Sequence, residues 1–304
     1  MTTSAPTAVV PSVARTISTT ASRGKKRLTS PWASLAAVVI AVLWTLPTLG
    51  LLVTSFREET DIRRTGWWTA LSDPTFTLDN YREALGRESG GGGLVDYLVN
   101  SFVITVPSVV IPMVLAALAA YAFAWIHFPG RDFLFIAVFA LQIVPIQVTL
   151  IPLLTLFVQG DVGEFVRIWV AHSTFALPLA VFLLHNFMRD VPAELIEAAR
   201  VDGAGHVKTF FSVVLPLMTP ALAAFGIFQF LWVWNDLLVA LTFAGGTPQT
   251  APMTVALANL SGTRGTDWYL LSAGAFISIV IPVVVFLALQ RYFVRGLLAG
   301  SVKG

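Results

Sequence analysis

The stretch VPAELIEAARVDGAGHVKTFFSVVLP, residues 191–216, is a polar interruption between two long apolar runs. Nearly all of the remaining chain is hydrophobic, so a charged, helix-forming segment of this length has to face water. We therefore expect this segment to lie outside the apolar body of the protein and to contact another molecule there.

The beginning of this segment predicts a short helix with clear ends. Asp190 and Pro192 are typical of a helix start, and Glu194 and Glu197 favour the positive end of the helix dipole. Gly203 is expected to stop the helix, because glycine readily takes a positive φ.

The two sides of the expected helix differ in character. Leu195, Ala198 and Ala199 lie at helical spacing and make a narrow apolar stripe. Glu197 and Arg200 are three residues apart and can pair on the polar side.

A second short amphipathic piece is expected over residues 206–214, before Leu215 and Pro216 redirect the chain into the next apolar run. A solvated connector is the simplest interpretation, but connectors are usually shorter and less regular. Two short amphipathic helices around a glycine hinge favour a segment that docks on another protein. Coupling between two proteins requires a rigid contact that can take two positions.

The composition outside this segment indicates an integral membrane protein. Of 304 residues, 56% are hydrophobic and 12% are charged, about half the charged fraction of a soluble domain. The net charge of +2 does not argue for nucleic acid. The absence of cysteine excludes disulfides and thiolate sites, and the four histidines lack metal-ligand spacing.

Six apolar stretches are long enough to cross a bilayer, which takes about 20 residues. They centre on residues 32–54, 98–126, 133–157, 165–188, 219–243 and 269–291. Several contain proline, which membrane helices tolerate. Small residues crowd the second stretch and predict close helix packing there.

The basic residues predict that both termini are cytoplasmic. Of the 19 Lys and Arg residues, twelve lie on the side that holds the amino terminus and seven on the other side, a bias that marks the inner face. The 189–218 loop is then cytoplasmic. The loops at 55–97 and 245–268 are extracytoplasmic.

The ends of the chain carry less information. Residues 1–30 are rich in Ser, Thr, Ala and Pro and end in basic residues, which predicts a disordered tail with a basic anchor. A cleaved signal peptide is disfavoured, because the uncharged stretch that follows is too long for a signal core.

In the 55–97 loop, we interpret the glycine run at 90–93 as a connector and the tryptophan pair at 67–68 as an interfacial belt.

The loop motif resembles the EAA loop of binding-protein-dependent ABC importer permeases. It reads EAA at 197–199, glycine at 203, valine at 213 and LP at 215–216, with valine in place of the commoner isoleucine. Asn100–Ser101, AAYAFA at 119–124, FPGR at 128–131, WND at 234–236 and the carboxyl terminus are similar to the carbohydrate, maltose-type branch. The tail and APMT at 251–254 look most like its α-glucoside members.

This resemblance implies an all-α integral membrane fold with six transmembrane helices, the type I ABC importer permease fold, and a cytoplasmic coupling-helix loop. It implies a non-enzymatic subunit of the bacterial cytoplasmic (inner) membrane. Its partners are a second homologous permease, two ATPase subunits that hold ATP and Mg²⁺, and an extracytoplasmic sugar-binding protein. We expect the chain itself to bind no nucleotide, in keeping with the lack of a G-x-x-x-x-G-K-[ST] loop.

The resemblance also implies roles for particular residues. Those expected to dock in an ATPase cleft or shape the loop are Glu197, Ala198, Ala199, Asp202, Gly203, Leu215 and Pro216. The substrate is expected to be a di- or oligosaccharide, with an α-glucoside such as maltose or trehalose as the finer expectation.

Polar residues of the fifth stretch are candidates for the translocation path, because an ionisable group in a membrane is expensive. They are Gln229, Trp232, Asn235 and Asp236. A structural role or a partner contact competes with sugar binding at Asp236.

The turn that follows the fifth stretch is a candidate contact for the binding protein, with a plain surface turn as the alternative. Its residues are Gly245, Gly246, Thr247, Pro248 and Gln249.

Three other functions compete with this interpretation. A secondary transporter often shows matching halves and several intramembrane charges, neither of which is evident. A membrane enzyme needs convergent catalytic groups, and none converges here. A permease for a non-sugar solute also remains open.

Overall fold

The computed structural model describes residues 31–86, 93–262 and 266–301, with side chains up to Gln290. These ranges are α-helical, with one isolated β-bridge between Arg57 and Phe76. The chain divides into two units, Met1–Val53 and Thr54–Gly304. The tail expected at 1–30 and most of the glycine run at 90–93 lie outside the described residues.

Helix α2 (Pro31–Ser55) accounts for the described part of the first unit and contains Pro47. At 1.5 Å per residue its 25 residues are long enough to cross a bilayer.

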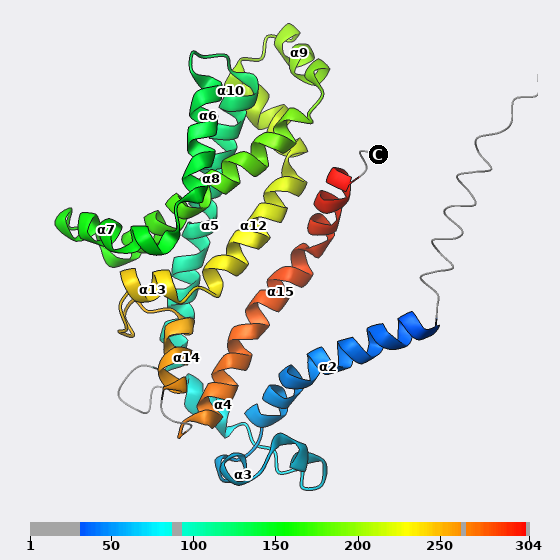
Figure 1. Ribbon diagram of the computed structural model, residues 1–304, viewed down its shortest axis with the longest axis vertical. Coiled ribbons are helices and arrows are strands. Elements are labelled where there is room, and N and C mark those ends of the chain that lie inside the picture. The colour runs from blue at the N-terminus through cyan, green and yellow to red at the C-terminus, as the bar shows by residue number, and fades with distance from the viewer. Residues whose placement is uncertain (1–30, 87–92, 263–265, 302–304) are drawn as a thin grey trace, which may run out of the picture. The chain divides into compact units, whose positions relative to one another are not determined.

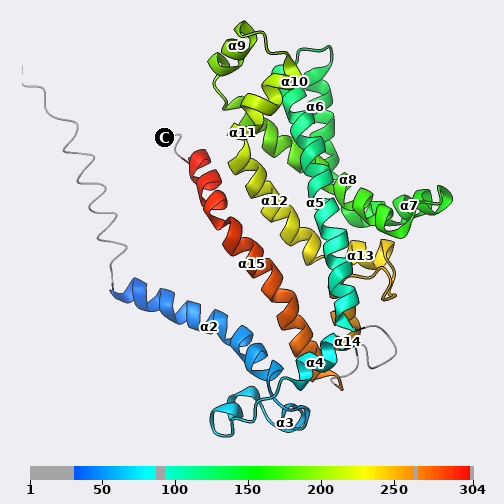
Figure 2. The ribbon, with the colours of Figure 1, turned by 180° about the vertical axis from the view of Figure 1, so that it is seen from behind.

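The core of the second unit is the pairing of α5 (Leu94–Trp125) with α8 (Glu164–Arg189), which lie side by side in both views (Figures 1 and 2). Alanines line the contact: Ala116 and Ala120 of α5 and Ala180 of α8 are fully buried. Small side chains let two backbones approach closely in a membrane, so the alanine-rich stretch serves packing, as its composition predicts.

The third expected span is bent rather than continuous. It consists of α6 (Arg131–Ala140), the 3₁₀ turn η2 (Leu141–Ile143) and α7 (Ile146–Gln159), with a bend of 102° between its halves. Val144 is extended, with ψ 120°, because the following Pro145 disfavours the helical conformation in the residue before it.

The fifth expected span is also broken. Residues 219–243 form α12 (Thr219–Trp234) and α13 (Leu238–Phe243), separated by Asn235–Leu237. A further bend of 72° separates α12 from the preceding helical segment at 206–217. Pro216 and Pro220 flank that bend, and proline removes a backbone donor from the helix.

Two further helices complete the second unit. Helix α14 (Met253–Ser261) and the long α15 (Trp268–Ser301) pack on each other, and α15 also runs along α12 (Figure 1). By length and composition, four described helices can cross a membrane, or six if each bent pair counts as one span. The expected all-α membrane fold is confirmed, with a span count compatible with six.

The segment before α5 folds around a buried arginine. It contains α3 (Glu59–Arg64), η1 (Trp67–Leu71) and α4 (Asp79–Leu85). Arg57 is 3% exposed, and its guanidinium donates to the Gly66 carbonyl (3.0 Å) and to Thr69 Oγ1 (3.1 Å). The Asn80 amide donates to the carbonyl of Arg57 at 2.7 Å. This part of the 55–97 loop is therefore an ordered unit.

Candidate functional site

The loop at 189–218 folds as a helix, a glycine hinge and a second helical segment at one end of the second unit, named here the α9 end (Figure 1). Helix α9 (Ala193–Val201) follows Pro192 directly, and Gly203 has φ 78°. The expected start and stop of this helix are confirmed. Gly203 is required for its backbone conformation alone, because a Cβ there would have nothing within 4 Å.

The second helical segment is less regular than the sequence predicts. It comprises α10 (His206–Thr209), a π-helical turn η3 (Phe210–Val214) and α11 (Leu215–Leu217). The π turn widens the helix just before Pro216, and such turns are frequent at functional sites.

The outer face of the loop is uncovered. Glu197, Ala198, Asp202 and Gly203 are exposed, and Ala199 is half-buried. Apolar side chains stand beside them: Leu195 is 43% exposed and Val201 is 88% exposed. Exposed apolar groups on a rigid helix next to charged ones are typical of a protein contact surface.

The inner face of the loop is fixed to the spans. Ile196 is 2% exposed and Val214 is fully buried, both in a core cluster with residues of α5 and α8. The hydroxyl of Tyr121 on α5 lies 3.2 Å from Nδ1 of His206. The Tyr121 ring also packs edge-on against Phe210, with centroids 5.2 Å apart. The loop is therefore joined to α5 by one polar and one aromatic contact.

Sequence reasoning missed Ile196 and Tyr121 as the anchors of the loop. Ile196 stands next to the Leu195 stripe and could have been found from its i, i+3 relation to Ala199 and Ala193. Tyr121 lies 85 residues from its partner, and no local pattern signals that contact.

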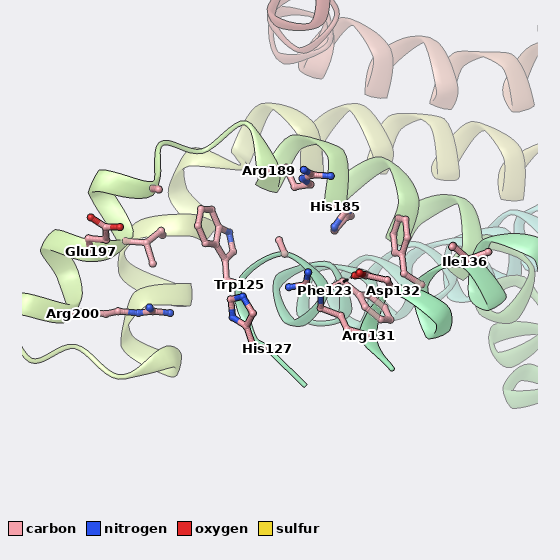
Figure 3. A pocket seen from close by; sticks show the side chains of 14 residues that line it. Phe123, Trp125, His127, Arg131, Asp132, Ile136, His185, Arg189, Glu197 and Arg200 are labelled. Atoms are coloured by element: carbon pink, nitrogen blue, oxygen red, sulfur yellow. Dashed lines mark hydrogen bonds and ion pairs between the residues drawn. The ribbon is translucent and has the colours of Figure 1, made fainter. Parts of the chain in front are cut away.

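The expected pairing of Glu197 with Arg200 is wrong for the described residues, where no ion pair joins the two. Figure 3 shows the reason: the Arg200 guanidinium extends from α9 toward Trp125 and His127, and the Glu197 carboxylate points away from it. Among the described residues, Glu197 therefore has no ion-pair partner.

Two of the four residues expected along the translocation path lie inside the bundle. Gln229 on α12 is 1% exposed, and its amide donates to the Ser108 carbonyl at 3.2 Å. Trp232 is half-buried, and its ring packs edge-on against His172, with centroids 5.7 Å apart.

The other two lie at the break after α12. Asn235 is exposed. The Asp236 carboxylate accepts hydrogen bonds from the backbone N–H of Ala240 (2.9 Å) and Val239 (3.4 Å), and it lies 3.8 Å from His172 Nε2. It thus caps the first turn of α13.

The turn at 245–249 is held at its base. Gly245 has φ 67°, and Gly245, Gly246, Thr247 and Gln249 are exposed, with Pro248 half-buried. The Asn100 amide at the start of α5 donates to the carbonyls of Pro248 (2.8 Å) and Ala251 (3.1 Å). The turn therefore presents an exposed tip on a fixed base.

A bundle of membrane-length helices with an uncovered helix–glycine–helix loop at one end is the architecture of an integral membrane protein. The chain belongs to the family described as the inner membrane component of binding-protein-dependent transport systems, which matches residues 109–298. It is a permease subunit and not an enzyme, as the loop motif predicts.

Relatives that match over most of their own length support this assignment. The chain is 54% identical over 274 residues to the osmoprotective compounds uptake permease protein GgtD of Synechocystis, covering 88% of this chain and 91% of the relative. It is 39% identical to the alpha-glucoside transport system permease protein AglG of Rhizobium meliloti, covering 90% and 97%. It is 36% identical to the trehalose transport system permease protein SugB of Mycobacterium tuberculosis, covering 92% and 100%.

A solved structure shares the fold. A chain of a bacterial ABC transporter involved in the import of the polysaccharide alginate matches with a TM-score of 0.70 at 19% identity, over 88% of this chain and 98% of that one.

Proposed function

We propose that this protein is one permease subunit of an ATP-driven, binding-protein-dependent importer of a small sugar or glucoside. Its loop at 189–218 docks on an ATPase subunit in the cytoplasm. ATP binding by two such subunits moves the docked helix, and the spans then alternate between inward-open and outward-open states.

The single observation that carries this proposal is the two-faced geometry of α9. Its outer face is uncovered and carries Glu197 beside Leu195 and Val201, while its inner face is anchored through Ile196. A helix that is exposed on one side and rigidly joined to the spans on the other is suited to pass a movement from a partner to the membrane region.

The names of the relatives support the class of solute. They transport osmoprotective compounds, alpha-glucosides and trehalose. Trehalose is itself an α-glucoside, so an α-glucoside fits the names of the last two relatives, and trehalose and maltose are the first solutes to test.

The proposed assembly contains a second homologous permease, two ATPase subunits with ATP and Mg²⁺, and an extracytoplasmic binding protein that meets the turn at 245–249. Both termini lie in the cytoplasm, in keeping with the excess of basic residues on that side.

The test is purification from the native membrane followed by transport in liposomes. We expect an ATPase and a second permease to copurify, and trehalose or maltose uptake to require ATP and the binding protein. Sugar flux by this chain alone, without ATP, would establish a secondary transporter instead.

A further inference from the structure

A cavity of about 620 Å³ opens at the α9 end of the second unit. Its walls come from the end of α5 and the turn after it, the first turn of α6, the last turn of α8 and the inner side of α9 (Figure 3). It shares Glu197 with the docking face of α9, and none of the four candidates for the translocation path lines it.

The cavity is rich in cationic side chains. Arg131, Arg189 and Arg200 line it together with two carboxylates, Asp132 and Glu197. Arg131 is paired with Asp132, whose side chain is 85% exposed, at 3.1 Å. Among the described residues, neither Arg189 nor Arg200 has an ion-pair partner. The cavity thus holds two guanidinium groups that no carboxylate of the described residues pairs with directly.

Two hydrogen-bonding groups at the cavity lack a partner. Trp125 Nε1 and His185 Nδ1 are both buried and make no hydrogen bond within the described residues. The indole N–H is a donor only, and His185 is 9% exposed. In Figure 3, Trp125, His185, Arg189 and Arg131 stand around one space, with the Arg200 side chain directed toward it. Burying a hydrogen-bond donor without an acceptor costs free energy. A bound ligand that supplies acceptor atoms explains why these two groups lie at the cavity.

An apolar surface continues from the cavity along α6. Phe133 is 79% exposed and Ile136 is 65% exposed, and Ile136 also lines the cavity. These side chains belong to a segment apolar enough to lie in a bilayer. A ligand that fits both surfaces has an anionic head and a hydrocarbon tail, because cationic groups at the ends of spans attract anionic lipid headgroups.

We propose that this cavity binds the phosphate group of an anionic membrane phospholipid, with the acyl chains along the exposed face of α6. Arg189 and Arg131 bind the phosphate oxygens, the Trp125 indole donates to them, and Arg200 reaches the headgroup from α9. The lipid thereby joins α9 to α6 and α8 and stiffens the base of the coupling loop. This site does not depend on which solute is transported.

The test is lipid titration of the purified full-length protein with its copurifying partners, monitored by native mass spectrometry. The probes are phosphatidylglycerol and phosphatidylcholine of the same acyl composition. We expect phosphatidylglycerol to bind at one saturable site, and Arg189→Gln to weaken it about fivefold, the effect of one basic group near a membrane surface. Trp125→Phe keeps the ring and the charge but removes the donor, so about a fivefold loss is expected there too.

Lys208→Gln is the matched control, because Lys208 is exposed on the same loop and lies outside the cavity. The control is expected to bind phosphatidylglycerol as the wild type does. Size-exclusion profiles establish that each variant is folded and assembled; if Arg189→Gln does not assemble, Trp125→Phe decides the question, since it changes no charge.

A parallel titration with sn-glycerol 3-phosphate distinguishes a membrane phospholipid from a soluble phosphate ester as the source of the phosphate group. If this soluble ester binds as tightly as phosphatidylglycerol and is weakened by the same two substitutions, the phosphate site stands and its lipid source is wrong. Equal affinity for phosphatidylglycerol and phosphatidylcholine, or an equal loss in Lys208→Gln, would overturn the site itself.

Discussion

The hydroxyl of Tyr121 lies 3.2 Å from Nδ1 of His206 and joins the end of α5 to the second helix of the docking loop. The same ring packs against Phe210. One side chain therefore makes both a polar and an apolar contact between a span and the loop, and we expect movement of the loop to reach α5 through it.

Tyr121→Phe removes the hydrogen bond and keeps the ring contact. A hydrogen bond of this kind contributes about 1 kcal/mol, so we expect full assembly with an uptake about fivefold lower at unchanged or raised ATP hydrolysis. The measurement is the number of sugar molecules transported per ATP in liposomes. An unchanged ratio would show that the hydroxyl takes no part in coupling.

Gly203→Ala is expected to destabilise the loop by about 1–2 kcal/mol, because alanine is strained at a positive φ. Nothing lies within 4 Å of the added Cβ, so strain is the whole effect. Gly203→Asn serves as the control, since asparagine tolerates this conformation better. Proteolysis of the loop in the purified protein measures the difference, and equal protection of both variants would contradict this explanation.

Local sequence signals predict the ends of α9 well. They do not predict contacts between residues that are distant in the sequence. Pro192 and Gly203 act through the backbone of their immediate neighbours, so their effects are visible in sequence. The bends at Pro145 and Pro216 are harder to predict from sequence, because membrane helices such as α5 continue through proline. The proline alone does not say which helices break.

The cavity behind α9 could not be predicted for a related reason. Glu197 and Arg200 have the spacing of a helical pair, but the Arg200 side chain extends toward Trp125 and His127 and away from the Glu197 carboxylate. The direction of a long side chain is decided by the tertiary surroundings, and these involve α5, α6 and α8, which are distant in sequence.

Asp236→Ala is expected to cost about 1 kcal/mol, because the caps on Ala240 and Val239 are lost. Asp236→Asn retains a capping oxygen and is expected to be close to wild type in thermal stability. Thermal unfolding of the assembled protein checks this order. Equal loss in both variants would show that the charge beside His172, and not the cap, supports the structure.

Asn100→Ala removes two donors from the base of the turn at 245–249, and we expect that turn to loosen. Hydrogen exchange of residues 245–252 is expected to rise several-fold, with lower uptake in the presence of the binding protein. Gln249→Ala, at the exposed tip, is the control for exchange and should leave it unchanged. If residues 245–252 of Asn100→Ala exchanged at the wild-type rate, the two hydrogen bonds from Asn100 would not be what holds this turn.

Glu197→Lys tests the docking face of α9 most directly. The carboxylate is exposed and has no ion-pair partner among the described residues, so charge reversal leaves the fold intact and opposes a basic group on the ATPase. Glu164→Lys, exposed at the first turn of α8, is the control for charge reversal alone.

The decisive measurement is ATP-dependent sugar uptake by the Glu197→Lys protein, together with the amount of ATPase that copurifies with it. The account predicts that uptake falls at least tenfold, the effect of about 1.4 kcal/mol at a charge-assisted contact, while Glu164→Lys transports normally. Wild-type uptake with full assembly in Glu197→Lys would contradict the claim that this face of α9 couples ATP to transport.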